Sequence, residues 1–387
     1  MTDSQTPTSA AGAATEAPPV EATAAANAPS AQATSGGRSF LPKSTLLRHL
    51  VVLVGCAVLA VVILEVTTPF QNSQLATLTY YAIAAGGLTL LTGLNGQISL
   101  GHGALMAIGA YTTALFLQAD EPLPLIVILL IAIALTSLVG ALVGVAAARL
   151  HGPYLAGATL ALAVGLPGLA VYFQGTFGGD QGLRVRAPDA PESFDTFIGW
   201  VSGNPATNTK WLAYLGAICL LITYFLLANL GRSRMGRTWR AVRDQEVAAE
   251  LAGINLGAWR VLAFVVSAAC AGLAGGVLAL VVRLAAPSGF TLVLSLALLT
   301  AIVIGGLGSL LGALLGSALL VFLPPFVTDL GGDWFGLDST KAAQLAPFVY
   351  GLVLIVVMIF APAGVVGTLR LRWLTSRAQR AAGRTRG

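Results

Sequence analysis

The chain has 387 residues, of which 56% are apolar and only 10% are charged, and its mean hydropathy is +0.83. Soluble domains carry roughly a quarter charged residues, so this composition excludes an ordinary soluble protein and predicts one that resides in a lipid bilayer. The net charge of +5 does not indicate a nucleic-acid partner, because the arginines gather at the ends of apolar segments and in one loop, where they orient a membrane chain.

Residues 1–45 predict a disordered tail. The first 37 are rich in Ala, Thr, Ser and Pro, contain no Lys or Arg, and show no periodic apolar pattern, so they cannot bury enough surface to become ordered. A secretory signal peptide does not fit, because the first apolar run begins only near Leu46. An organelle transit peptide does not fit a segment that has acids and lacks arginine.

Six apolar segments are long enough to cross a bilayer once, at about 17 to 25 residues each. Two longer regions, 75–118 and 290–323, are interrupted by glycine-rich polar sequence, and each is interpreted as two segments. The sequence therefore predicts an all-α, polytopic transmembrane helix bundle over residues 46–368, with about 8 to 10 spans and with broken or re-entrant segments. The single segments lie near 47–66, 125–148, 153–173, 211–230, 260–282 and 346–367.

The first interrupted region, within 86–116, places Asn95, Gln97, Ser99 and His102 among four glycines. Irregular backbone at membrane depth survives only where it is buried in protein or lines a water-filled cavity. Transporters often build a binding site or a gate from such a broken helix. These four residues are therefore candidates for a substrate pathway, and a glycine-rich packing turn between two helices is the alternative.

An outer loop is predicted at 174–210 and a charge-rich loop at 231–258. The second loop is expected to form a short helix that Asp244 caps at its start and that Gly253 ends in the left-handed conformation. Such a helix gathers Val247, Ala248, Leu251 and Ala252 on one face, as an inert connector or as a dock for another protein.

The second interrupted region begins with a turn at 305–309 and continues with Gly308, Gly312 and Gly316 at spacings of four. This stripe of small residues is typical of membrane helices that pack closely, so packing is the favoured interpretation.

The distribution of basic residues predicts the topology. With the N-terminus inside, the cytoplasmic side holds 16 Lys and Arg residues and the outer side holds 5, as the positive-inside rule requires. The bias favours an even number of spans, ten or eight with re-entrant segments. It also makes 1–45, the loop 231–258 and the basic tail 369–387 cytoplasmic.

Six motifs occur in order along the chain: GLNGQISLGHGALMAIGAY, HGPYLAGATLALAVG, GGDQGL, GRTWRAVRDQEVAAELAGI, TAIVIGGLGSLLGALLGS and YGLVLIVVMIFAPAGVVG. Together they resemble the second membrane permease of branched-chain amino-acid ABC importers, the LivM type, over roughly residues 45–368. The resemblance implies a non-enzymatic subunit of an ATP-driven importer in the bacterial cytoplasmic membrane. It implies four kinds of partner: a second permease, two ATPase subunits, an extracytoplasmic substrate-binding protein and the lipid bilayer.

In such importers a cytoplasmic loop with a Glu-Ala-Ala…Gly motif docks into the ATPase. Here the motif is matched with one extra residue, Val247, after the glutamate. The ATPase-coupling residues that the resemblance implies, together with the basic approach to the motif, are Arg240, Arg243, Asp244, Glu246, Ala248, Ala249 and Gly253. ATP is implied on the partners only, with no cofactor on this chain. Branched-chain amino acids are the implied ligand, and urea or short amides are the alternative.

Other functions find less support in the residues. No charged residue lies near the middle of a span, which disfavours a proton-coupled secondary transporter. Ser99 and His102 lack the sequence setting of a nucleophile, so no catalytic residue is predicted. The chain has no intact Walker A sequence, so ATP hydrolysis must come from elsewhere. A passive channel remains possible on composition alone, but it has no need of a docking loop. All three cysteines fall inside spans, which predicts buried thiols with no disulfide or metal role.

Overall fold

The computed structural model describes residues 45–119, 123–150, 153–202, 207–335, 339–361, 364–369, 372–373 and 375, all within one compact unit, Lys43–Gly387. The predicted tails, 1–45 and 369–387, lie almost entirely outside these residues. The described part is built from helices and one pair of two-residue strands. This confirms the predicted all-α bundle.

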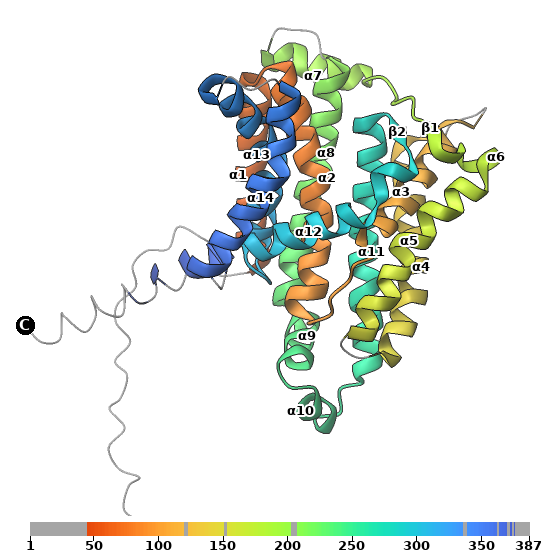
Figure 1. Ribbon diagram of the computed structural model, residues 1–387, viewed down its shortest axis with the longest axis vertical. Coiled ribbons are helices and arrows are strands. Elements are labelled where there is room, and N and C mark those ends of the chain that lie inside the picture. The colour runs from red at the N-terminus through yellow and green to blue at the C-terminus, as the bar shows by residue number, and fades with distance from the viewer. Residues whose placement is uncertain are drawn as a thin grey trace, which may run out of the picture. The chain divides into compact units, whose positions relative to one another are not determined.

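The long helices are α1 (Thr45–Val66), α2 (Pro69–Leu88), α4 (Leu125–Arg149), α5 (Pro153–Tyr172), α8 (Asn208–Arg232), α11 (Leu256–Val282), α13 (Leu310–Phe335) and α14 (Ser339–Phe360) (Figure 1). Two shorter apolar helices are α3 (His102–Leu117) and α12 (Leu292–Gly305). The remaining elements are η1 (Thr89–Leu94), α6 (Gln174–Phe177), η2 (Gly179–Gln181), β1 (Leu183–Arg184), α7 (Glu192–Ser202), α9 (Arg234–Asp244), α10 (Glu246–Leu251), β2 (Leu284–Ala285) and η3 (Pro287–Phe290).

Nine helical segments in the described ranges are long and apolar enough to cross a membrane, and α3 is a shorter apolar helix. This number falls within the predicted 8 to 10 spans, but it is odd, and the even number that the charge distribution favours requires the shorter α3 to be a tenth crossing. Both predicted interruptions are present. The helix of α2 continues through the π-helical η1, the chain is non-helical over 95–101, and α3 then begins. In the second region a turn at 306–309 separates α12 from α13.

Helix α11 lies at the centre of the packing. It contacts α4, α3 and α2, and Figure 1 shows it between α2 and α4. Small residues allow membrane helices to approach closely. A Cβ atom on Gly109 of α3 would collide with the backbone of Gly272 in α11. A shift of α11 therefore acts on three other helices at once.

The predicted glycine stripe packs α13 against α12. A Cβ atom on Gly312 would lie 2.5 Å from the carbonyl oxygen of Gly305, and one on Gly316 would collide with the carbonyl of Ala301. Gly308 is not part of this contact, because it lies in the preceding turn with a φ of +79°. The packing interpretation is thus confirmed for two of the three glycines.

The cysteines are not all buried. Cys270 is buried and Cys219 is partly buried, but Cys56 is exposed. Helix α1 packs mainly against α8, so only one side of it is covered by this chain. The prediction of a buried thiol is therefore wrong for Cys56.

A two-stranded ribbon marks one end of the bundle, which we call the ribbon end. Strand β1 pairs antiparallel with β2, and the side chain of Gln118 donates a 2.7 Å hydrogen bond to the carbonyl of Arg184 in β1. Figure 1 shows this ribbon and α7 at one end of the bundle and α9 and α10 at the other.

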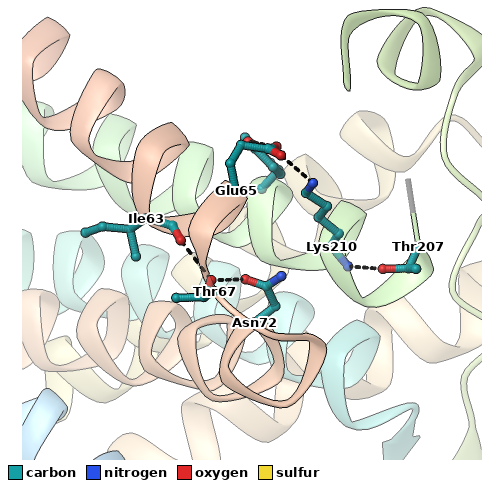
Figure 2. A network of polar contacts seen from close by, with 7 residues as sticks. Ile63, Glu65, Thr67, Asn72, Thr207 and Lys210 are labelled. Atoms are coloured by element: carbon teal, nitrogen blue, oxygen red, sulfur yellow. Dashed lines mark hydrogen bonds and ion pairs between the residues drawn. The ribbon is translucent and has the colours of Figure 1, made fainter. Parts of the chain in front are cut away.

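An ion pair joins α1 to α8. Lys210 Nζ lies 2.5 Å from Glu65 Oε2, and both side chains are largely buried (Figure 2). The hydroxyl of Tyr214 donates to the other oxygen of Glu65 at 2.7 Å. Thr67 shapes the turn that follows, because its hydroxyl oxygen lies 2.8 Å from the carbonyl oxygen of Ile63 and 2.6 Å from Asn72 Oδ1 (Figure 2).

Candidate functional site

The charge-rich loop folds as two helices rather than one. Helix α9 begins after Ser233, whose hydroxyl accepts a 3.1 Å hydrogen bond from the backbone of Met235. The predicted cap, Asp244, is instead the last residue of α9, and its carboxylate accepts from Arg243 Nε and Nη2 at 2.9 and 2.7 Å. That prediction is wrong because the neighbouring guanidinium engages the carboxylate. Gln245 occupies the N-cap position of α10.

The C-terminal end of α10 matches its prediction. Gly253 has a φ of +81°, and its backbone N–H donates to the carbonyl of Glu250 at 2.9 Å. A residue with a Cβ atom is strained in this left-handed conformation, so glycine suits the position.

The apolar face of α10 is uncovered by this chain. Val247 is 69% exposed and Leu251 is 85% exposed, and Ala248 and Ala252 are exposed as well. Ala249 lies on the opposite side and is buried. The predicted face therefore exists, and of the two alanines in the motif only Ala248 belongs to it.

The opposite side of the loop is bound to the bundle. Glu246 Oε1 lies 2.5 Å from Arg260 Nη2 in the first turns of α11. The indole N–H of Trp239, a fully buried residue of α9, donates to the carbonyl of Trp259 at 2.9 Å. These contacts join α9 and α10 to the start of α11.

Two of the predicted coupling arginines bind carbonyl groups of this chain. Arg240 donates to the carbonyls of Gly236 and Gly231, at 3.0 and 2.5 Å, and so caps the end of α8. Arg243 donates through Nη1 to the carbonyl of Gly93, at the end of η1. The basic loop is thus tied to α8, to α11 and to the end of η1, just before the helix breaks.

The broken segment, 95–101, has partners for many of its freed backbone groups. The N–H groups of Asn95, Gly96 and Gln97 donate back to carbonyls of η1, each at 3.2 Å. The N–H of Leu100 donates to the hydroxyl of Thr159 in α5 at 3.0 Å. These bonds allow a helix to break at membrane depth.

All four predicted pathway residues are buried by this chain. Asn95 Nδ2 donates to Gln97 Oε1 at 2.8 Å, and His102 Nε2 lies 3.1 Å from the carbonyl of Ala84 in α2. Ser99 lies in the same segment. The structure therefore brings the four together along one stretch of chain, enclosed by neighbouring helices.

Three of these residues also carry a buried polar atom with no hydrogen-bond partner among the described residues: Asn95 Oδ1, Ser99 Oγ and His102 Nδ1. Leaving such an atom unsatisfied costs about 1–3 kcal/mol. Unsatisfied groups of this kind need a functional or structural reason. Asn95 and Ser99 lie in the broken segment and His102 is the first residue of α3, so three of the ten such atoms among the described residues lie at or beside the break.

The two glycine turns that the sequence shows separately are in contact. A Cβ atom on Gly93 would collide with the backbone N of Gly308. The end of η1 thus lies between Arg243 of α9 and the turn at 306–309.

Sequence reasoning missed the residues that support these elements. Ser295 of α12 accepts a 2.9 Å hydrogen bond from the backbone of Gly103, and Arg260 holds Glu246. Ser295 and Thr159 are isolated hydroxyls in apolar spans. Only Arg260, a charge at the start of a span, gave a signal in the sequence.

A groove of about 650 Å3 lies elsewhere, between α2 and α13. It is lined mainly by Phe and Leu side chains, with Gln71, Gln74 and Asp329 among them, and by none of the four predicted pathway residues. Among the residues described, no three His, Cys, Asp or Glu side chains come together as a metal site requires.

The similarity to known proteins covers the elements described above. The model of the family described as "Branched-chain amino acid transport system / permease component" matches residues 72–359, which include the broken segment and the loop. No solved structure matches the chain significantly.

Three similar proteins are permeases. LivM of Escherichia coli, a high-affinity branched-chain amino acid transport system permease protein, is 29% identical over 330 residues, which cover 80% of this chain and 74% of LivM. BraD of Pseudomonas aeruginosa is 28% identical over 299 residues, or 74% of this chain and 91% of BraD. LivH of Escherichia coli is 28% identical over 298 residues, again 74% and 91%.

Proposed function

The chain belongs to the family of permease components of branched-chain amino acid transport systems, and from that premise we propose that it is one of two different permeases in an ATP-driven importer. The ligand is a branched-chain amino acid, as the names of the similar permeases suggest. The observation that carries the proposal is the exposed apolar face of α10, on a loop whose other side is bound to the bundle.

The face formed by Val247, Ala248, Leu251 and Ala252 docks on an ATPase subunit. Helix α10 lies between the last residue of α8 and the first of α11, outside both spans. Large apolar side chains that are exposed next to a charged loop mark a protein interface, because leaving them in water is unfavourable. A short helix inserted into a groove is a common form of such a contact.

The basic loop and both termini are cytoplasmic, and the ribbon end faces outward. The positive-inside distribution supports this orientation. Two ATPase subunits then bind ATP on the cytoplasmic side, and an extracytoplasmic binding protein delivers the ligand at the ribbon end. The membrane is the bacterial cytoplasmic membrane. This chain supplies neither ATP binding nor hydrolysis.

Transport proceeds by alternating access. When the ATPases close, they move α10, and the ion pair between Glu246 and Arg260 passes that movement to α11. Because α11 packs on α2, α3 and α4, its displacement alters the pathway formed with the partner permease. Asn95, Gln97, Ser99 and His102 line that pathway or its gate. The binding protein carries out most of the ligand selection, so urea or a short amide is the alternative ligand.

Reconstitution tests this function directly. The chain is purified with its partner permease and ATPases, inserted into proteoliposomes without an ion gradient, and supplied with binding protein, ATP and a panel of amino acids and urea. We expect uptake that requires ATP and is largest for a branched-chain amino acid. Uptake that ignores ATP and follows a proton or sodium gradient would instead identify a secondary transporter.

A further inference from the structure

Arg243 joins the charge-rich loop to the end of η1, immediately before the broken segment. Its Nη1 atom donates a hydrogen bond to the carbonyl of Gly93, while Nε and Nη2 donate to Asp244. A guanidinium is planar, so engaging two of its nitrogens with one carboxylate fixes the direction of the third. Asp244 therefore aims Arg243 at Gly93.

The carbonyl of Gly93 is available because the helix ends there. In a continuing α-helix it would accept from the N–H of Gln97, but that N–H donates to Leu91 instead. The last carbonyls of a helix require other donors, and a cation suits the negative end of the helix dipole. Arg243 thus supplies a group that the broken helix requires.

The fit around this bond is close. A Cβ atom on Gly96, which has a φ of +80°, would lie 2.8 Å from Arg243 Cγ. On its other side, Gly93 is in contact with Gly308. A displacement of α9 relative to η1 must therefore stretch this bond, move the segment that begins at Asn95, or push on the 306–309 turn.

We propose that Arg243 is a positioning residue that couples the ATPase-bound loop directly to the broken segment, by a route separate from α8 and α11. The proposal rests on the function proposed above, in which α10 docks on an ATPase. Contact with the ATPase sets the position of α9. Through its hydrogen bond to Gly93, Arg243 then makes the conformation of residues 95–101 depend on that position.

A pair of matched variants measures the coupling. Arg243→Gln removes the guanidinium, and Arg237→Gln is the control, because Arg237 lies on the same helix and donates to a carbonyl at the end of α8, that of Arg232, at 3.2 Å. In the reconstituted complex we expect Arg243→Gln to lower uptake per ATP hydrolysed by about 2- to 30-fold. Complex yield should stay within about twofold of wild type, and Arg237→Gln should keep the wild-type uptake per ATP hydrolysed.

A second measurement follows the segment itself. Ile98 is 51% exposed between buried neighbours, so a cysteine at this position reports on 95–101 in a background without the native cysteines. We expect its rate of thiol labelling to differ between nucleotide-free and vanadate-trapped complexes when Arg243 is present, and to lose that difference in Arg243→Gln. A purely structural arginine would not make labelling depend on nucleotide.

If Arg243→Gln reduces complex yield, Arg243→Lys is measured in its place, because lysine keeps the positive charge but lacks the planar set of N–H donors of the guanidinium. It should show a smaller loss in the same direction. Normal uptake per ATP in the variant, or a nucleotide response at position 98 that survives it, would overturn the coupling role. A wild-type complex without ATP-dependent uptake would overturn the proposed function as well.

Discussion

Arg260 and Glu246 join α11 to α10 through a contact of 2.5 Å, although only 7% of the arginine side chain is exposed against 48% of the glutamate side chain. The buried charge lies on the transmembrane helix and the accessible one lies on the docking helix. Taking a charge out of water is costly unless a partner compensates it. The pair therefore holds α10 in one orientation relative to the bundle.

Glu246→Gln should loosen the loop. The substitution keeps the shape of the side chain and removes the charge that faces Arg260, so we expect α9 and α10 to separate more often from α11. Trypsin cleavage at the loop arginines of the purified protein should become several-fold faster, since proteolysis follows the population of the opened form. Ligand-stimulated ATP hydrolysis by the complex should fall.

The matched control is Glu250→Gln. Glu250 is exposed on the same short helix and its side chain has no ion pair among the described residues. Trypsin should cleave the loop of this variant at the wild-type rate. Equal protection of Glu246→Gln and wild type would show that the ion pair does not set the position of α10.

The docking face gives a second prediction. Burying a leucine side chain contributes about 1.5–3 kcal/mol, so Leu251→Asp should weaken binding of the ATPase subunits by about tenfold to a hundredfold. Co-purification and a titration with isolated ATPase would measure this. Thr238→Asp adds the same charge to a partly exposed position of α9 and should bind normally. If both variants bind alike, the interface lies elsewhere.

The sequence predicts the features that depend on local pattern. Hydropathy and glycine spacing are enough for the helix bundle, for both interruptions and for the close packing at Gly312 and Gly316. The left-handed Gly253 also follows from its place after a helix. The sequence does not place Asp244 correctly, because a helix cap and an arginine partner compete for the same carboxylate and local sequence does not decide between them.

Long-range contacts were not predictable. Arg243 and Gly93 are 150 residues apart, and neither sequence motif contains a signal that predicts contact with the other. The same holds for Thr159 and Ser295, hydroxyls within apolar spans that bond to Leu100 in the broken segment and to Gly103 at the start of α3. Cys56 was expected to be buried because composition does not show which side of a span the rest of the chain covers.

The broken segment allows a test of pathway against packing. Asn95→Leu removes the hydrogen bond to Gln97 without adding charge, and Gln97→Leu does the same from the other side. If these groups line the pathway, both variants should assemble with their partners and lose most of their uptake. Complex yield and uptake are therefore measured side by side.

Gly101→Val is the comparison for packing. A Cβ atom at Gly101 would lie 2.6 Å from the carbonyl oxygen of Thr159, so this variant should destabilise the protein and lower complex yield. Normal uptake by both leucine variants, with loss of yield only in Gly101→Val, would leave the segment as a packing turn.

The orientation of the chain gives the last prediction. Single cysteines at Ser193, an exposed residue of α7 near the ribbon end, and at Ser376, in the predicted cytoplasmic tail, are placed in a background without the three native cysteines. Removing the native cysteines leaves each introduced thiol as the only site that the reagent can label. Position 193 should react with an impermeant thiol reagent in intact cells, and position 376 should react only after permeabilisation, because the 16 basic residues assigned inside against 5 outside orient the chain with both termini in the cytoplasm. Equal labelling at both positions in intact cells would contradict this orientation.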